Sequence, residues 1–131
     1  MSRPHFLQPF LRGAGAALGL RNVRTGLPIA THVETAFDSS ARRRGLLRHD
    51  RFPPDHAMVI APSSLVHTFG MRFSIDMLFV ARNGMVLKVR RAVPPRRIAG
   101  RIGSFAVVEL AVGQIDASDT RIGDTIEAVP L

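Results

Sequence analysis

Short apolar runs rich in Val, Ile, Leu and Phe alternate with polar stretches along most of the chain. Runs of this length, bounded by Gly, Pro, Asn or Asp, are typical of β-strands, and helical periodicity is nearly absent. The pattern predicts about eight strands. They span residues 20–24, 29–36, 57–61, 65–71, 75–81, 85–93, 105–112 and 125–129.

Two turn signals and one helix signal divide these runs. Thr25-Gly26 predicts a hairpin between the first two strands. Asn83-Gly84 predicts a second hairpin through a type I′ turn, because both central residues of that turn need positive φ. The N-cap candidates in residues 38–40 predict one short helix over residues 41–47.

These elements predict an all-β fold, a compact antiparallel β-sandwich or barrel-like domain with one short helix. The chain has 131 residues, so we expect one domain over residues 20–131. Residues 1–19 form either an N-terminal arm or a weak signal-like segment. We expect a cytoplasmic protein, with export as the alternative. No apolar run is long enough to span a bilayer.

The composition excludes several kinds of chemistry. The chain has no Cys, which excludes disulfides, thiolate catalysis and iron–sulfur clusters. Its five histidines show no close paired spacing, so we expect no metal site and no cofactor. No nucleophile elbow, phosphate loop or dinucleotide-binding motif occurs.

The chain is strongly basic, with a formal net charge of +8. Arginine guanidiniums suit phosphate and carboxylate recognition. Nucleic acid is nevertheless not expected, because single-strand binders add exposed aromatic platforms and the chain has no Trp or Tyr. The arginines gather in two clusters: Arg42, Arg43, Arg44, Arg48 and Arg51, then Arg90, Arg91, Arg96, Arg97 and Arg101.

Two acidic residues interrupt apolar strands. Alternation places Asp76 on the same face as Leu78 and Val80, and Glu109 on the same face as Phe105 and Val107. A carboxylate removed from water costs several kcal/mol unless it is paired, hydrogen-bonded or protonated. Both acids therefore need partners inside the domain.

The candidate partners are Arg42, Arg44, His67 and backbone amides. If these groups converge with Asp76 and Glu109, they form a polar pocket for a small polar or anionic ligand or partner. Two alternatives remain open. The two carboxylates serve as acid and base in a hydrolase-type enzyme, or they only lock a structural or interaction domain. The sequence leaves the oligomeric state open.

Several motifs resemble domain-of-unknown-function family 192, a group of small bacterial and archaeal β-proteins. Residues 42–47 resemble its Arg-x-x-Gly-Leu-Met stretch, and Met58 stands in its Gly-Met-Leu-Phe strand. Residues 67–76 resemble its central motif, which ends in Pro-Leu-Asp. Residues 108–113 resemble its Leu-Glu-x-x-x-Gly strand, and residues 123–124 its terminal Gly-Asp. The resemblance runs from about residue 20 to residue 129.

The chain departs from the family pattern at its central motif. His67 stands where the family has Trp, and Phe69-Gly70 stands where it has Lys-Asn. Leu47 replaces a Met, and His49 an Arg. The resemblance implies a compact β-sandwich-like fold and places further emphasis on Arg42, Asp76 and Glu109. It implies no established reaction or cofactor.

Overall fold

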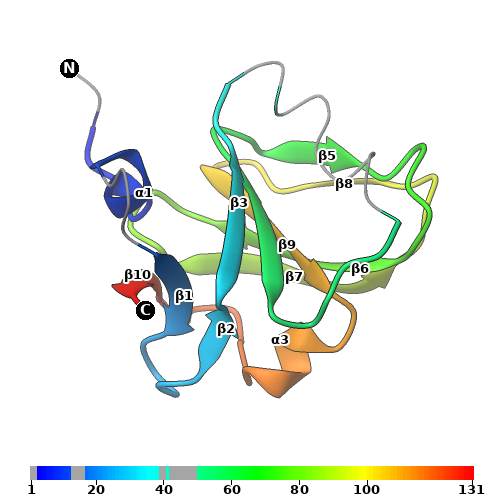
Figure 1. Ribbon diagram of the computed structural model, residues 1–131. Helices are drawn as coiled ribbons and strands as arrows, with labels where there is room; N and C mark the ends of the chain where they lie inside the picture. The colour runs from blue at the N-terminus through cyan, green and yellow to red at the C-terminus, as the bar shows by residue number, and fades with distance from the viewer. Residues whose placement is uncertain (1–2, 13–16, 39–40, 42–49) are drawn as a thin grey trace.

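Ten strands in the described part of the chain lie in three sheets (Figure 1). The computed structural model describes residues 3–12, 17–38, 41 and 50–131. The described elements are α1 Gln8–Arg12, β1 Leu18–Asn22, β2 Pro28–Ala30, β3 His32–Ala36, β4 His56–Ile60, β5 Leu65–His67, β6 Ile75–Val80, β7 Val86–Val93, β8 Ile98–Gly100, β9 Ala106–Ala111, α3 Gln114–Ala117 and β10 Ile126–Pro130.

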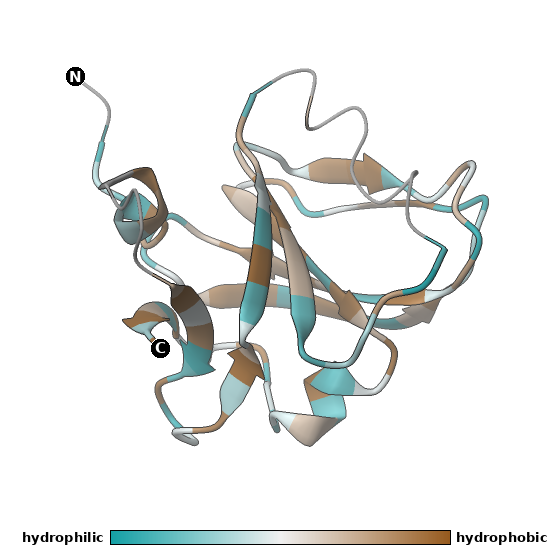
Figure 2. Cartoon of the chain, in the orientation of Figure 1, coloured by the Kyte–Doolittle hydropathy of each residue, from teal (hydrophilic) through white to brown (hydrophobic). Residues whose placement is uncertain are grey.

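A five-stranded sheet of order β3-β4-β9-β6-β7 forms the centre of the domain. Every residue of β6 and of β9 is buried. Another layer covers each face of the sheet at these two strands, so side chains on both faces are buried. This is why the sequences of β6 and β9 are apolar almost throughout. On the edge strand β3, hydrophobic and hydrophilic residues alternate instead, visible as brown and teal bands in Figure 2. The centre of the sheet is therefore the most strongly buried backbone in the molecule.

One face of the central sheet packs against the three-stranded sheet β10-β1-β2. Leu78 and Val108 meet Leu20, Ile29 and other residues of the smaller sheet there. The N-terminal segment also contributes, because Leu7 is fully buried in this cluster. No described helix is long and apolar enough to cross a membrane.

The opposite face packs against the two-stranded ribbon β5-β8. Met77, Phe79 and Val107 from the central sheet meet Val66 and Ala99 from the ribbon. The ribbon's outer residues are exposed, since Leu65 and His67 on β5 alternate with the inward Val66. The central sheet thus separates two distinct apolar clusters.

The all-β expectation is confirmed, with differences that reflect long-range packing. Residues 29–36 form two strands in different sheets instead of one, and residues 98–100 form the unpredicted strand β8. The sheets are not antiparallel throughout, because β3 pairs with β4 in parallel. Two described helices, α1 and α3, lie outside the predicted helical segment. That predicted helix, at residues 41–47, falls largely outside the described residues.

Both predicted hairpins form, but the turn type at Asn83-Gly84 is wrong. β1 pairs with β2 around Gly26, and β6 pairs with β7 around Gly84, both antiparallel. Gly84 has φ 92°, whereas Asn83 does not adopt positive φ. The Gly84 amide donates to the Ala81 carbonyl (3.0 Å), as in a three-residue loop with glycine in the left-handed region.

Candidate functional site

Asp76 lies at the junction of three segments and is 1% exposed. Its Oδ1 accepts a hydrogen bond from the Ala92 amide (2.9 Å). Its Oδ2 accepts bonds from the amides of Gly113 (3.1 Å) and Ile115 (3.2 Å). The expectation of a buried, paired carboxylate is confirmed, and its partners among the described residues are backbone amides, one of the predicted kinds.

Local irregularities aim these amides at Asp76. The register of β6 against β7 shifts between Ile75 and Met77, which leaves Ala92 in a bulge with φ 49°. Gly113, with φ 96°, turns the chain from β9 into α3, so its amide and that of Ile115 both face the carboxylate. Asp76 therefore fastens the end of β7 and the start of α3 to the central sheet.

Glu109 occupies a different environment on the same sheet. It is 3% exposed and lies between Met58 of β4 and Met77 of β6 in the strand register. No hydrogen bond or ion pair joins its carboxyl to any other described residue. Burial raises the pKa of Glu109 to about 8, because the charged form loses its hydration.

Asp76 and Glu109 point to opposite faces of the central sheet. Asp76 shares its face with Leu78, in the cluster below β1 and β2, whereas Glu109 shares its face with Met77, below the ribbon. Carboxylates on opposite faces of one sheet do not converge on a single reacting bond. The geometry therefore gives no support to an acid–base pair made of these two residues.

Of the remaining predicted site residues, the structure describes only His67, which lies away from both carboxylates. His67 is exposed on β5, where its Nδ1 accepts a hydrogen bond from the Phe69 amide (3.2 Å) and its ring lies 5.7 Å from the Phe69 ring. Neither contact involves Asp76. Arg42 and Arg44 fall outside the described residues. Asp76, Glu109 and His67, the three predicted site residues that the structure describes, therefore do not share a pocket.

A pocket of about 490 Å³ lies instead between two loops next to the ribbon. Its lining residues are Gly70, Met71, Pro95, Arg96 and Arg97. In the sequence, Arg96 and Arg97 belong to a basic cluster, and residues 70–71 belong to the family-like central motif. The sequence does not predict that these two segments lie side by side, because their proximity depends on the pairing of β5 with β8.

Thr68 holds the two loops of this pocket together and is fully buried. Its amide donates to the Arg97 carbonyl (2.8 Å), and its hydroxyl donates to the Pro94 carbonyl (2.7 Å). The Arg97 amide donates back to the Thr68 hydroxyl (2.9 Å). The Thr68 carbonyl accepts from Arg96 (3.3 Å) and Met71 (3.2 Å). The pocket walls are therefore fixed by backbone hydrogen bonds.

Some described arginines have an acidic partner, and the two pocket arginines belong to those that have none among the described residues. Arg21, Arg24, Arg72, Arg91 and Arg121 each form an ion pair with Asp or Glu. Among the described residues, Arg96 and Arg97 form none, and the Arg97 guanidinium donates to the carbonyls of Pro95 (3.5 Å) and Arg96 (3.3 Å). Arg96 also has φ 67°, an uncommon value for a bulky residue.

A second, smaller cavity of about 110 Å³ lies beside the N-terminal segment. His5 and Phe105 line it, with their rings 4.8 Å apart, and the Arg82 guanidinium lies 4.5 Å from the Phe105 ring centroid. Its volume is below the roughly 300 Å³ at which small-molecule pockets begin. The basic pocket of about 490 Å³ exceeds this volume.

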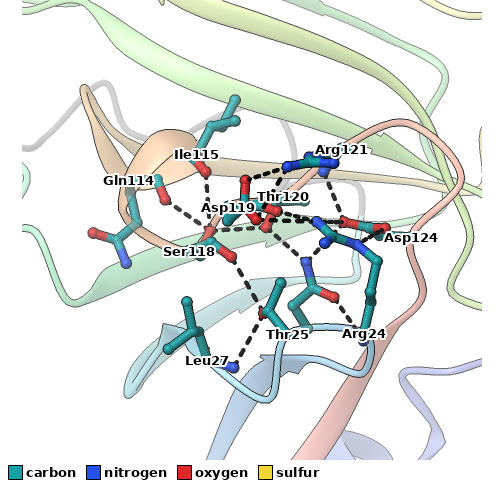
Figure 3. Close-up of polar contacts among 11 residues, drawn as sticks. Arg24, Thr25, Leu27, Gln114, Ile115, Ser118, Asp119, Thr120, Arg121 and Asp124 are labelled. Carbon is teal, nitrogen blue, oxygen red and sulfur yellow. Dashed lines mark hydrogen bonds and ion pairs between the residues drawn. The ribbon is translucent and has the colours of Figure 1, made fainter.

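A buried polar network at the other end of the domain has a structural role (Figure 3). Asp124 accepts hydrogen bonds from Arg24 Nε (2.7 Å), Asn22 Nδ2 (2.9 Å) and the Arg121 amide (2.8 Å). The Arg24 hydrogen bond is the main cause that lowers the pKa of Asp124 to about 2. The only sequence signal for this network was the family-like Gly123-Asp124. The network ties β1 to the loop that precedes β10.

The protein is a small β domain built from layered sheets, and its candidate anion site is the basic pocket beside the ribbon. Residues 21–128 match the model of the DUF192 family, described as "Uncharacterized ACR". The chain therefore belongs to this family, as its motifs had suggested.

The relatives support the same assignment. A UPF0127 protein of Thermococcus sibiricus is 36% identical over 62 residues, which cover 47% of this chain and 40% of that protein. This chain thus spans less than half the length of that relative.

Two solved structures share the fold. A candidate transcription regulator from Sinorhizobium meliloti has a TM-score of 0.74 at 24% identity, covering 88% of this chain and 97% of its own. A protein of unknown function from Novosphingobium aromaticivorans has a TM-score of 0.69 at 18% identity, covering 84% and 82%. At these identities the likeness shows the fold alone.

The amide contacts of Asp76 predict a large stability loss in Asp76→Asn. The new side-chain NH₂ group cannot accept from the amides that the lost oxygen had served, and a buried donor is left unpaired. We expect the free energy of unfolding to fall by about 2–5 kcal/mol in urea denaturation. Asp116→Asn is the matched control, because Asp116 is an exposed carboxylate paired with exposed Arg91. It should cost at most about 1 kcal/mol. Equal small losses in both variants would contradict this role of Asp76.

The raised pKa of Glu109 predicts that Glu109→Gln stabilises the protein at pH 7, whereas Asp76→Asn destabilises it. Between the ordinary pKa of 4.5 and about 8, the folded state holds a proton that the unfolded state has lost. Wild-type stability should therefore decline as the pH rises through this window, by up to about 3 kcal/mol at pH 7. The Gln variant lacks this decline, so it should be more stable than wild type at pH 7 and equal to it near pH 4. Parallel stability–pH curves for the two proteins would contradict the raised pKa of the buried Glu109 carboxyl.

Proposed function

We propose that this domain is a binding module for a small anionic ligand, held at the pocket between residues 70–71 and 95–97. The observation that supports this most is the presence of Arg96 and Arg97 at a fixed pocket without an ion-pair partner among the described residues. Guanidinium groups present planar donor pairs that match carboxylate and phosphate oxygens. The ligand class is therefore a small carboxylate or phosphate compound.

The pocket also has the size and rigidity that a ligand site needs. Its volume of about 490 Å³ lies within the range of small-molecule pockets, which extends from roughly 300 to 1,000 Å³. Thr68 fixes both loops before a ligand arrives, so little conformational entropy is lost on binding. His67 pairs with Ile98, the residue that follows the pocket residue Arg97. It is the one residue from the predicted site that we retain in this proposal.

Asp76 and Glu109 have other roles in this proposal. Asp76 is saturated by backbone amides, and Glu109 is buried among methionines on the sheet. Neither residue lines the proposed pocket, so neither is assigned a part in holding the anion. The enzymatic alternative receives no support from the geometry, for the reason already given.

Titration calorimetry at low ionic strength with inorganic phosphate and with citrate tests the proposal. The double variant Arg96→Gln/Arg97→Gln should bind at least about tenfold more weakly than wild type, because each lost charge-assisted hydrogen bond is worth roughly 1.5–3 kcal/mol. The control double variant Arg21→Gln/Arg121→Gln removes the same charge from arginines already paired with acids. It should bind like wild type.

Two results would overturn the proposal. Equal weakening in both double variants would show that only net charge attracts the anions. The absence of saturable binding to the wild-type protein, with either anion, would show that the pocket is not an anion site. Thermal melts of each variant without ligand confirm that the fold is retained.

A further inference from the structure

The parallel pairing of β3 with β4 brings two distant histidines together. His32 begins β3 and His56 begins β4, and the two residues are direct partners in the register. Their imidazole rings stack with centroids 4.6 Å apart and planes at 9°. Local sequence spacing gave no sign of this pair, because 24 residues separate the two histidines. Only the strand order of the sheet places them side by side.

Asp55 completes a three-residue cluster. Its Oδ2 lies 3.2 Å from Nδ1 of His32, and its Oδ1 lies 3.7 Å from Nε2 of His56. One ligand atom from each of the three residues lies within 4.8 Å of the other two. The Thr31 hydroxyl lies 3.4 Å from Asp55 Oδ2 and supplies an outer hydrogen bond to the carboxylate. The cluster therefore holds two imidazole nitrogens and a carboxylate in one place.

Backbone hydrogen bonds fix the positions from which these side chains project. The amides of Thr31 and His32 both donate to the Asp55 carbonyl, at 2.9 and 3.0 Å. The His56 amide donates to the Pro53 carbonyl (3.1 Å). The side chains themselves are accessible, with exposed fractions of 64% for His32, 51% for Asp55 and 36% for His56. A fixed backbone below accessible side chains allows a solvated ion to enter and the side chains to adjust around it.

We propose that His32, Asp55 and His56 form a binding site for a divalent transition-metal ion of the Zn²⁺ type. Imidazole nitrogen and carboxylate oxygen bind Zn²⁺ at about 2.0–2.2 Å, so ligand atoms around a tetrahedral ion lie about 3.4 Å apart. The His32–Asp55 separation already has this value, and the other ligand atoms need to move inward by about an ångström. Rotation of exposed side chains supplies that movement.

The ligand set selects among metals. Two nitrogens and one carboxylate favour Zn²⁺, Ni²⁺, Co²⁺ or Cu²⁺ over Mg²⁺ and Ca²⁺, which prefer oxygen ligands. Three protein ligands leave a fourth position for water or for a ligand atom from another molecule. Because His32 lies on the edge strand β3, the ion would also join this edge to its neighbour β4.

Titration of the full untagged chain with Co²⁺, monitored by visible absorption, tests this site. We expect one Co²⁺ per chain with a tetrahedral d–d spectrum that Zn²⁺ abolishes and excess Mg²⁺ leaves unchanged. His32→Gln, His56→Gln and Asp55→Asn should each weaken binding by about tenfold or more. His67→Gln is the matched control, because it removes an exposed histidine outside the cluster. It should leave binding unchanged.

Thermal melts with and without metal distinguish loss of the metal site from poor folding of a variant. In EDTA, the variants should melt close to wild type, since all three positions are accessible to solvent. With excess Zn²⁺, only wild type and His67→Gln should melt at a higher temperature, because a bound ion stabilises the folded state. The inference is wrong if the three cluster variants bind Co²⁺ as tightly as wild type, if His67→Gln abolishes binding, or if no stoichiometric binding occurs.

Discussion

The hydrogen bonds from backbone amides to the buried Asp76 carboxylate are the constraint on which the rest of the domain depends. β6 is buried along its whole length, and a charge placed there requires full compensation. The bulge at Ala92 and the turn at Gly113 supply it, with the Ile115 amide as the third donor. One side chain thereby holds the last residues of β7, the β9–α3 turn and the central sheet in one arrangement.

The central sheet also keeps its two buried acidic residues, Asp76 and Glu109, apart. Asp76 faces one apolar cluster and is saturated with donors, whereas Glu109 faces the other and has no partner among the described residues. A buried carboxyl group is therefore compensated by hydrogen bonds on one face and uncompensated by described residues on the other. The Asp76 carboxyl accepts three amide hydrogen bonds, whereas burial raises the pKa of Glu109. The anion site that we propose lies away from both carboxylates, at Arg96 and Arg97, which are exposed to solvent.

The sequence predicts those features that depend on short-range patterns. Burial of Asp76 and Glu109 follows from alternation within single strands, and both hairpins follow from their glycine turns. Features that depend on which strands become neighbours were missed. The parallel register that joins His32 to His56 and the β5–β8 pairing that places Arg97 beside Thr68 are set by packing between distant segments. The type I′ assignment failed because the loop takes one further residue, which leaves only Gly84 in the left-handed region.

Amide hydrogen exchange of the native protein tests the role of Asp76 most directly. If its carboxylate fastens the three segments, the amides of Ala92, Gly113 and Ile115 exchange only when the whole domain unfolds. Their opening free energies then equal those of the core amides in β6 and β9. Exchange as fast as that of Met85, whose amide is bonded within the exposed hairpin loop, would contradict this account. In that case the bulge and the turn open independently of the sheet, and Asp76 does not hold them.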